Sequence, residues 1–155
     1  MSYDLMVFDP LDAPRDRTHF IEWFKRTAEW PEGHGYNDPS VTTVMLRGWY
    51  DDIRRIFPNM NGPGAPSDEE LDRYGRRLAD YTISKHSIYV TFAWSVAEDA
   101  YTTVRETAVA HKVGFYDVSG DEGDGEIYFP GDHLRPPSQG KWREVSKQFQ
   151  EMTKQ

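Results

Sequence analysis

The sequence predicts an α+β fold, with a four- to five-stranded, mostly antiparallel sheet and helices packed on it. Short apolar or alternating runs, typical of strands, are separated by longer stretches in which apolar residues recur every three or four positions, as in helices. The chain of 155 residues has the length of one ordinary domain. Its 8 Phe, 9 Tyr and 5 Trp are enough large side chains to form a core, which argues against extended disorder.

The first two predicted elements are a strand and a helix. Tyr3–Phe8 is short and mostly apolar, and Asp9-Pro10 favours a turn after it. A helix is predicted over 14–29, because apolar side chains recur there at helical spacing, and Trp30-Pro31 ends it.

A second helix has the clearest start in the sequence. Asp38 is a suitable capping residue, Pro39 fits the first helical turn, and apolar residues then recur until Pro58. Gly48 weakens this helix by roughly 1 kcal/mol relative to alanine. Its presence in so apolar a helix indicates a close contact with another element.

The middle of the chain predicts a polar helix and a hairpin. Ser67 and Glu70 have the spacing of a capping box before a helix over about 68–79. The alternating runs Tyr81–Ser84 and Ser87–Trp94 predict two strands, joined by a tight turn at Lys85-His86.

The next elements are a helix and a second hairpin. Ser95 and Glu98 form another capping box, and helical spacing continues to His111. Val113–Val118 and Glu126–Phe129 are predicted to pair as strands around an acidic turn.

The order of these elements contains strand–helix–strand–strand–helix–strand, which is the pattern of a ferredoxin-like (split βαβ) core with a helical insertion. Residues 1–130 are expected to form one domain. Residues 131–155 hold a Pro/Gly-rich linker and a helix over 139–153, packed on the domain or on a partner chain.

Composition excludes several classes of protein. Without cysteine, the chain has no disulfide framework, thiolate metal site or cysteine nucleophile, in agreement with a cytoplasmic location. No apolar run approaches the ~18 residues of a membrane helix, and no signal peptide is expected. The formal net charge of −8 disfavours general affinity for nucleic acid, because phosphate is repelled.

The acidity is concentrated in one stretch. Residues 117–126 carry five acids and no base, more than half of the net charge. The turn is a candidate contact for a basic partner or a cation, although Asp and Gly also favour plain solvated turns. Its acidic residues are Asp117, Asp121, Glu122, Asp124 and Glu126.

The loop after the first helix is the second candidate binding site. Trp30, His34 and Tyr36 lie close together there with Glu32, in an irregular segment. Aromatic and ionisable residues on a loop are typical of recognition sites, whereas the alternative is that Trp30 only packs against the helix end.

No catalytic residue, metal site or cofactor is predicted. The five histidines are far apart, and the chain has neither a phosphate-binding loop nor a nucleophile elbow. A calcium-loop match that begins at Asp117 fails at its sixth and twelfth positions, Glu122 and Tyr128. Two acids distant in sequence can still converge in space, so an enzyme is not expected but stays open.

Three stretches together resemble a family of small, uncharacterised bacterial cytoplasmic proteins: Ser2–Pro10, Phe92–Glu98 and Gly114–Gly120. Some small acidic proteins of this kind resemble immunity proteins of polymorphic or interbacterial toxins. The resemblance carries no catalytic motif.

The function expected from the sequence is that of a non-enzymatic, acidic binding protein, an immunity or antitoxin-like inhibitor of a toxin with a basic surface. One alternative is a small enzyme or ligand-binding domain that uses carboxylates, with or without a metal. A second is a structural homodimer formed through the C-terminal helix.

Overall fold

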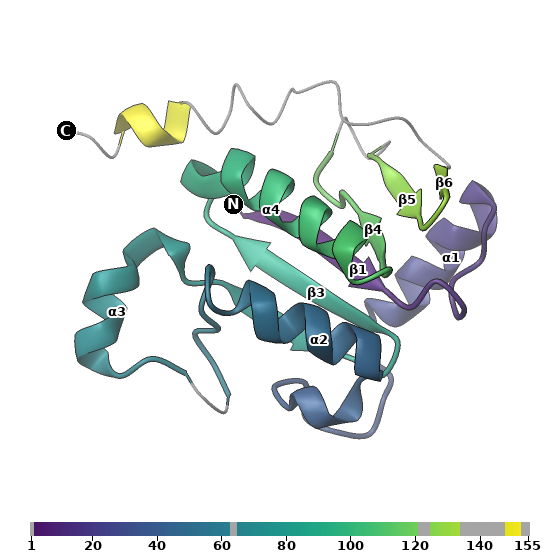
Figure 1. Cartoon of the computed structure of the whole chain (residues 1–155), viewed down its shortest axis with the longest axis horizontal. Helices are drawn as coiled ribbons and strands as arrows, with labels where there is room; N and C mark the ends of the chain where they lie inside the picture. The colour runs from purple at the N-terminus through teal and green to yellow at the C-terminus, as the bar shows by residue number, and fades with distance from the viewer. Residues whose placement is uncertain (1, 63–64, 121–124, 134–147, 153–155) are drawn as a thin grey trace.

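The computed structural model describes residues 2–62, 65–120, 125–133 and 148–152, and its fold is α+β, as predicted. One antiparallel sheet has the strand order β2-β3-β1-β4-β5-β6 (Figure 1). Five strands have three residues or more, and the sixth is a two-residue strand in the segment expected to be a linker. The strands are β1 (Tyr3–Phe8), β2 (Asp80–Ile83), β3 (Ser87–Phe92), β4 (Gly114–Tyr116), β5 (Ile127–Phe129) and β6 (Asp132–His133).

The helices lie near their expected places but are shorter. They are α1 (Arg17–Thr27), α2 (Val44–Ile53), α3 (Asp68–Tyr74) and α4 (Ala97–Ala110), with 3-10 turns η1 (Pro39–Val41), η2 (Gly75–Arg77) and η3 (Trp94–Val96). Residues 148–152 are also helical, whereas the rest of the helix expected over 139–153 lies outside the described residues. No helix in the described ranges is long and apolar enough to cross a membrane.

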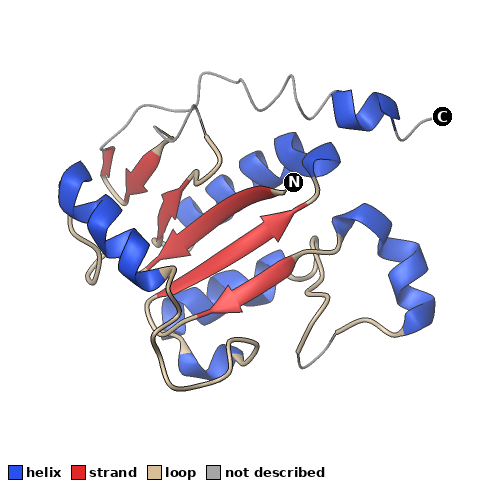
Figure 2. Ribbon diagram, turned by 180° about the vertical axis from the view of Figure 1, so that it is seen from behind, coloured by secondary structure: helices blue, strands red, loops and turns tan. Residues whose placement is uncertain are grey.

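Helices cover both faces of the sheet. The reason is the central strand β1, which is apolar on both sides. Tyr3, Leu5 and Val7 face a core formed with α2 and α4, whereas Met6 and Phe8 face a second core formed with α1. Figure 2 shows α1 on the near side of the sheet, and α2 and α4 behind it.

Four strands have the order expected of a split βαβ arrangement. β1 lies between β3 and β4, and β2 is the outer neighbour of β3. The helices of this arrangement on this side are α2, between β1 and β2, and α4, between β3 and β4, so α1 and α3 are additional helices. The ferredoxin-like description stays an interpretation of this order.

The second helix begins later than predicted. Asp38 caps only the short turn η1, and α2 starts after its own cap, Thr43, whose side chain accepts from the Leu46 backbone N–H. The Thr42 hydroxyl and the Thr43 N–H both donate to the Lys85 carbonyl oxygen, at 3.1 and 3.2 Å. These bonds to the β2–β3 turn hold the intervening chain out of a helix.

One capping box is confirmed and the other is wrong. Ser67 accepts from the backbone N–H of Glu70, as predicted for α3. Ser95 does not cap α4, because the chain forms the turn η3 first. The N-cap position of α4 is then Val96, which makes no side-chain capping bond. The close contact expected at Gly48 is also present, since an added Cβ would lie 3.3 Å from His111 Nδ1.

The described part of the C-terminal segment packs on its own chain. Phe149 is partly buried against the core of α2 and α4, and the Gln150 side chain donates to the Ser95 carbonyl oxygen at 2.7 Å. Met152 is 69% exposed.

Candidate functional site

The aromatic loop after α1 is an organised structure. Trp30, His34 and Tyr36, the three loop residues predicted from the sequence, form a chain of ring contacts. The centroids of Trp30 and Tyr36 are 5.7 Å apart, and those of His34 and Tyr36 are 4.9 Å apart. All three side chains are half-buried, so each keeps part of its surface exposed to solvent.

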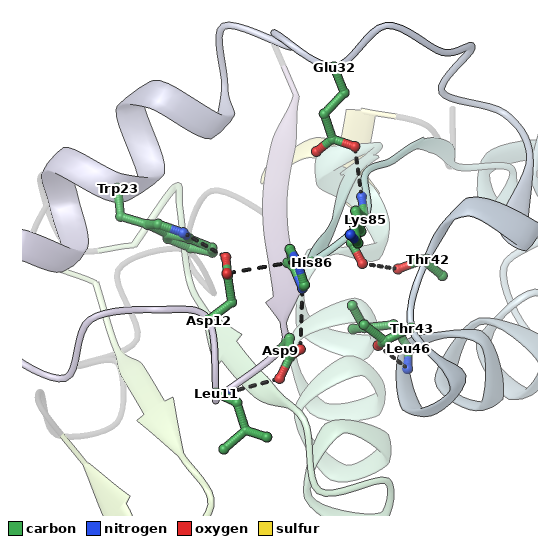
Figure 3. Close-up of polar contacts among 10 residues, drawn as sticks. All are labelled: Asp9, Leu11, Asp12, Trp23, Glu32, Thr42, Thr43, Leu46, Lys85 and His86. Atoms are coloured by element: carbon green, nitrogen blue, oxygen red, sulfur yellow. Dashed lines mark hydrogen bonds and ion pairs between the residues drawn. The ribbon is translucent and has the colours of Figure 1, made fainter.

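Hydrogen bonds tie this loop to the edge of the sheet. The Tyr36 carbonyl oxygen accepts from the N–H of Ile83 in β2 at 2.8 Å. The Glu32 carboxylate accepts from the N–H of Lys85 at 3.0 Å (Figure 3). Within the loop, the Tyr36 hydroxyl accepts from the Glu32 N–H at 2.8 Å and donates to the Glu32 carbonyl oxygen at 3.1 Å. The loop therefore presents its rings in one fixed arrangement.

Trp30 connects the loop to the face of the sheet. Its backbone φ of +52° is rare for a bulky residue and turns the chain sharply after α1. The indole edge packs on the ring of Tyr89 in β3, with centroids 5.7 Å apart, and the Phe24 ring of α1 stacks near Tyr89 at 6.4 Å. We call the rings of Phe24, Tyr89, Trp30, Tyr36 and His34 the aromatic strip.

His34 is the titratable member of the aromatic strip. Its Nδ1 lies 2.7 Å from the Gly35 carbonyl oxygen, and its Nε2 lies 2.5 Å from a Glu32 carboxylate oxygen. These two acceptors raise the pKa of His34 above its ordinary value, the Gly35 carbonyl most and the Glu32 carboxylate next. The protonated ring can donate to both at once.

A second polar cluster, missed by the sequence analysis, lies at the same end of the sheet. His86 Nδ1 is 3.3 Å from Asp9, its Nε2 is 3.8 Å from Asp12, and the Trp23 indole donates to Asp12 at 3.1 Å (Figure 3). Asp9 is largely buried and also accepts from the Leu11 N–H at 2.9 Å. The arrangement is one imidazole between two oriented carboxylates.

The sequence contained no signal for this convergence. Asp9 and Asp12 are typical turn and helix-start residues, and His86 lies more than seventy positions away. The register of the sheet brings them together, because Phe8 of β1 pairs with Ser87 of β3. Asp9 therefore lies beside His86, and its N–H donates to the His86 carbonyl oxygen at 2.9 Å.

The acidic turn differs from the expected surface patch. Asp117 and Glu126 are 0% and 1% exposed, so their side chains lie in the interior and cannot contribute to an acidic surface. Asp121, Glu122 and Asp124 fall outside the described residues. The two buried acids lie at the base of the β4–β5 hairpin, where the Asp117 N–H donates to the Glu126 carbonyl oxygen at 2.9 Å.

Each buried acid has internal partners. The Tyr3 hydroxyl donates to Asp117 at 3.0 Å, and burial together with this carboxylate raises the pKa of Tyr3 well above its usual value. Glu126 accepts from the Tyr101 hydroxyl at 2.6 Å and from Arg105. The hydrogen bond to Glu126 in turn raises the pKa of Arg105. This network joins the hairpin to β1 and α4.

The described residues contain no group of three or more His, Asp or Glu side chains placed to hold a metal ion.

No protein-family model, curated protein or solved structure matches the chain.

Proposed function

We propose that this chain is a non-enzymatic binding protein that inhibits a protein partner with a basic surface, as an immunity or antitoxin-like protein does. The observation that carries the proposal is the fixed, half-buried arrangement of Trp30, His34 and Tyr36. Trp and Tyr are enriched among residues that dominate binding energy at protein interfaces. Because the loop is already held by the sheet, little conformational entropy is lost when a partner binds.

The charge of the chain favours the same kind of partner. A formal net charge of −8 attracts a basic protein over a long range and accelerates association at low salt. Two exposed apolar side chains, in segments that contact the β2–β3 turn, add contact surface. Leu11, 88% exposed, follows the Asp9 turn, and Val44, 75% exposed, follows the Thr43 contact with Lys85.

The test begins with the immobilised chain, used to capture proteins from a lysate of its native host. The captured protein is then purified and titrated with the chain. We expect a stoichiometric complex in which the partner's activity is lost. Trp30→Leu should weaken binding about 30-fold or more, the effect of removing an interface residue that contributes 2 kcal/mol or more.

Val109→Ser is the matched control, since Val109 is an exposed apolar residue of α4, on the other face of the sheet. It should bind the partner as the wild type does. A complex that Trp30→Leu and Val109→Ser affect equally would contradict the role of the loop. A partner that keeps full activity in the complex would contradict inhibition.

A second candidate function rests on the convergence of Asp9, Asp12 and His86. A carboxylate that orients an imidazole is the arrangement of a general base, as expected for a small enzyme with carboxylate chemistry. The chain should then hydrolyse a member of a panel of esters, amides and phosphodiesters. His86→Gln should abolish that turnover, whereas His19→Gln, at an exposed histidine of α1, should not. Equal rates in both variants would remove this candidate.

A further inference from the structure

One half of the sheet is open on the side that carries α1. That helix packs on the end of β1 and on β4 and β5. Through Phe24 it also reaches Tyr89 of β3, but among the described residues no helix lies in front of β2, the C-terminal half of β3 and the first half of β1 (Figure 2). The outward side chains there are half-exposed or exposed: Asp4, Asp80, Thr82, Tyr89 and Thr91. We call these five residues the open face.

Two carboxylates lie in one row of the open face. Thr91 of β3 pairs with Asp4 of β1 on one side and with Asp80 of β2 on the other. Directly paired residues of antiparallel strands point to the same face. Neighbouring strands lie about 4.8 Å apart, so the Cα atoms of the two aspartates are separated by about 10 Å. The side chain of Thr91 lies between them in the same row.

Neutral donors hold both carboxylates in place. Asp4 accepts from the Ser2 hydroxyl at 2.7 Å and from the Tyr89 hydroxyl. Asp80 accepts from the Asn61 amide at 3.0 Å. Within the described part of the chain, neither aspartate forms an ion pair with Lys or Arg. Their positions are therefore fixed while their negative charges are not neutralised.

Two carboxylates on the other side of the sheet are, by contrast, paired with arginine. Asp51 pairs with Arg54 at 3.3 Å on α2, and Asp99 of α4 lies 2.8 Å from Arg77. Both of these pairs are on elements of the opposite side. The open face therefore carries two carboxylates that have no cationic partner among the described residues.

The aromatic strip borders the open face. Tyr89 belongs to both, and the Trp30 indole packs against it. A planar guanidinium can stack on such rings and donate to a carboxylate at the same time, whereas an ammonium group lacks the planar stacking. Rings next to fixed carboxylates are the chemistry that recognises arginine.

We propose that the open face binds a basic, arginine-containing segment of the partner protein, with Asp4 and Asp80 as counter-charges and Tyr89 and Trp30 as stacking surfaces. The proposal rests on the proposed function for the existence of that partner. It adds a contact that the aromatic loop alone does not supply, and it assigns the segment a charge. Nucleic acid does not fit, because the same carboxylates repel phosphate.

The first test uses a hexa-arginine peptide as the probe and measures its binding by the change in Trp fluorescence of the full chain. The wild type should bind the peptide, more weakly as salt rises. The double variant Asp4→Asn with Asp80→Asn should lower the affinity about tenfold or more and flatten the salt dependence. Hexa-lysine should bind less tightly than hexa-arginine to the wild type.

The matched control is Asp51→Asn with Asp99→Asn, which changes the net charge by the same amount on the other side of the sheet. It should bind hexa-arginine within about twofold of the wild type. An equal loss in the control would show that only total charge matters and would overturn the proposal. Unchanged binding in the Asp4→Asn, Asp80→Asn chain would also overturn it.

Thr91→Lys gives a second test that removes no hydrogen bond of Asp4 or Asp80. A cation between the two carboxylates should abolish hexa-arginine binding, with the fold checked by circular dichroism, and retained binding would contradict the site.

The two proposals can fail separately. If Trp30→Leu releases the purified partner but Asp4→Asn with Asp80→Asn does not, the open face is wrong and the binding function stands. If the open face binds hexa-arginine and the captured partner stays active, the inhibitory function is wrong.

Discussion

Arg105 and Glu126 form a two-point ion pair at the base of the β4–β5 hairpin. Arg105 Nε lies 3.0 Å from both carboxylate oxygens, and its Nη2 lies 2.9 Å from Oε2. The Glu126 side chain is fully buried, whereas Arg105 is 26% exposed. This pair links α4 to the hairpin that was expected to present an acidic surface.

Removing the cation should therefore destabilise the fold. Arg105→Met leaves the Glu126 carboxylate buried without its counter-charge, and we expect a loss of about 3–5 kcal/mol in the free energy of unfolding. Urea denaturation measures it. Arg54→Met is the control, because the Arg54–Asp51 pair is exposed and should contribute about 0–1 kcal/mol. Similar losses in both variants would contradict the importance of burial.

The His34–Glu32 pair should make the aromatic loop sensitive to pH. Since the pKa of His34 is raised in the folded chain, its contribution is fully present below the ordinary value of 6.5. The contribution is lost as pH rises through the raised pKa. The N–H of Lys85 donates to Glu32, so its amide exchange reports on this loop. We expect that exchange, corrected for intrinsic base catalysis, to be faster above the raised pKa of His34 than below it.

The same pair can be checked by an NMR titration of the histidine ring. Glu32→Gln should lower the pKa of His34, because one of the two acceptors then loses its charge. The pKa of His19 in α1, which is raised by the N-cap residue Asp16, should not change. A His34 titration that is identical in the wild type and in Glu32→Gln would contradict the pairing.

Gly114 should tolerate no side chain. A Cβ at this position would lie 2.1 Å from the ring of Phe8, which is fully buried in the second core. Gly114→Ala should therefore cost about 1–3 kcal/mol through overpacking, measured by thermal or urea unfolding. Gly33→Ala serves as the control, since nothing lies within 4 Å of its added Cβ, and it should change stability by about 0.5 kcal/mol or less.

Gly48 of α2 allows the close approach of the His111 ring, and replacing this glycine tests how much that contact matters. His111 lies against it and bonds to Asp52 of the same helix at 2.6 Å. Gly48→Ala should stabilise the chain by about 1 kcal/mol when His111→Ala has removed the contact. In the wild-type background the gain should be smaller, because the imidazole must move. Equal gains in both backgrounds, measured by urea unfolding, would contradict the close contact.

Local patterns were sufficient for much of the fold. The alternation and turn chemistry around Lys85-His86 predicted the β2–β3 hairpin, which the structure confirms. Ser67 and Glu70 likewise predicted the start of α3. These features depend on neighbours within a few residues, which are visible in the sequence itself.

The candidate site was predicted only in part. Trp30, His34 and Tyr36 were found because they lie within seven residues of one another, and the structure brings their rings together. Whether a partner binds them is a prediction. Tyr89 and Asp4, which extend this surface, were missed because they belong to strands in which a tyrosine or an aspartate has no special signature.

The sequence by itself determined the α+β class, the hairpins and the aromatic loop, since each follows from local periodicity and turn residues. Only the tertiary structure decided which charges are buried. Asp117 and Glu126 belong to an acidic stretch in the sequence, yet Tyr3, Tyr101 and Arg105 hold them in the interior. Sheet register likewise placed His86 beside Asp9, and Thr91 between Asp4 and Asp80. Burial and register depend on residues distant in the chain, so no local pattern could reveal them.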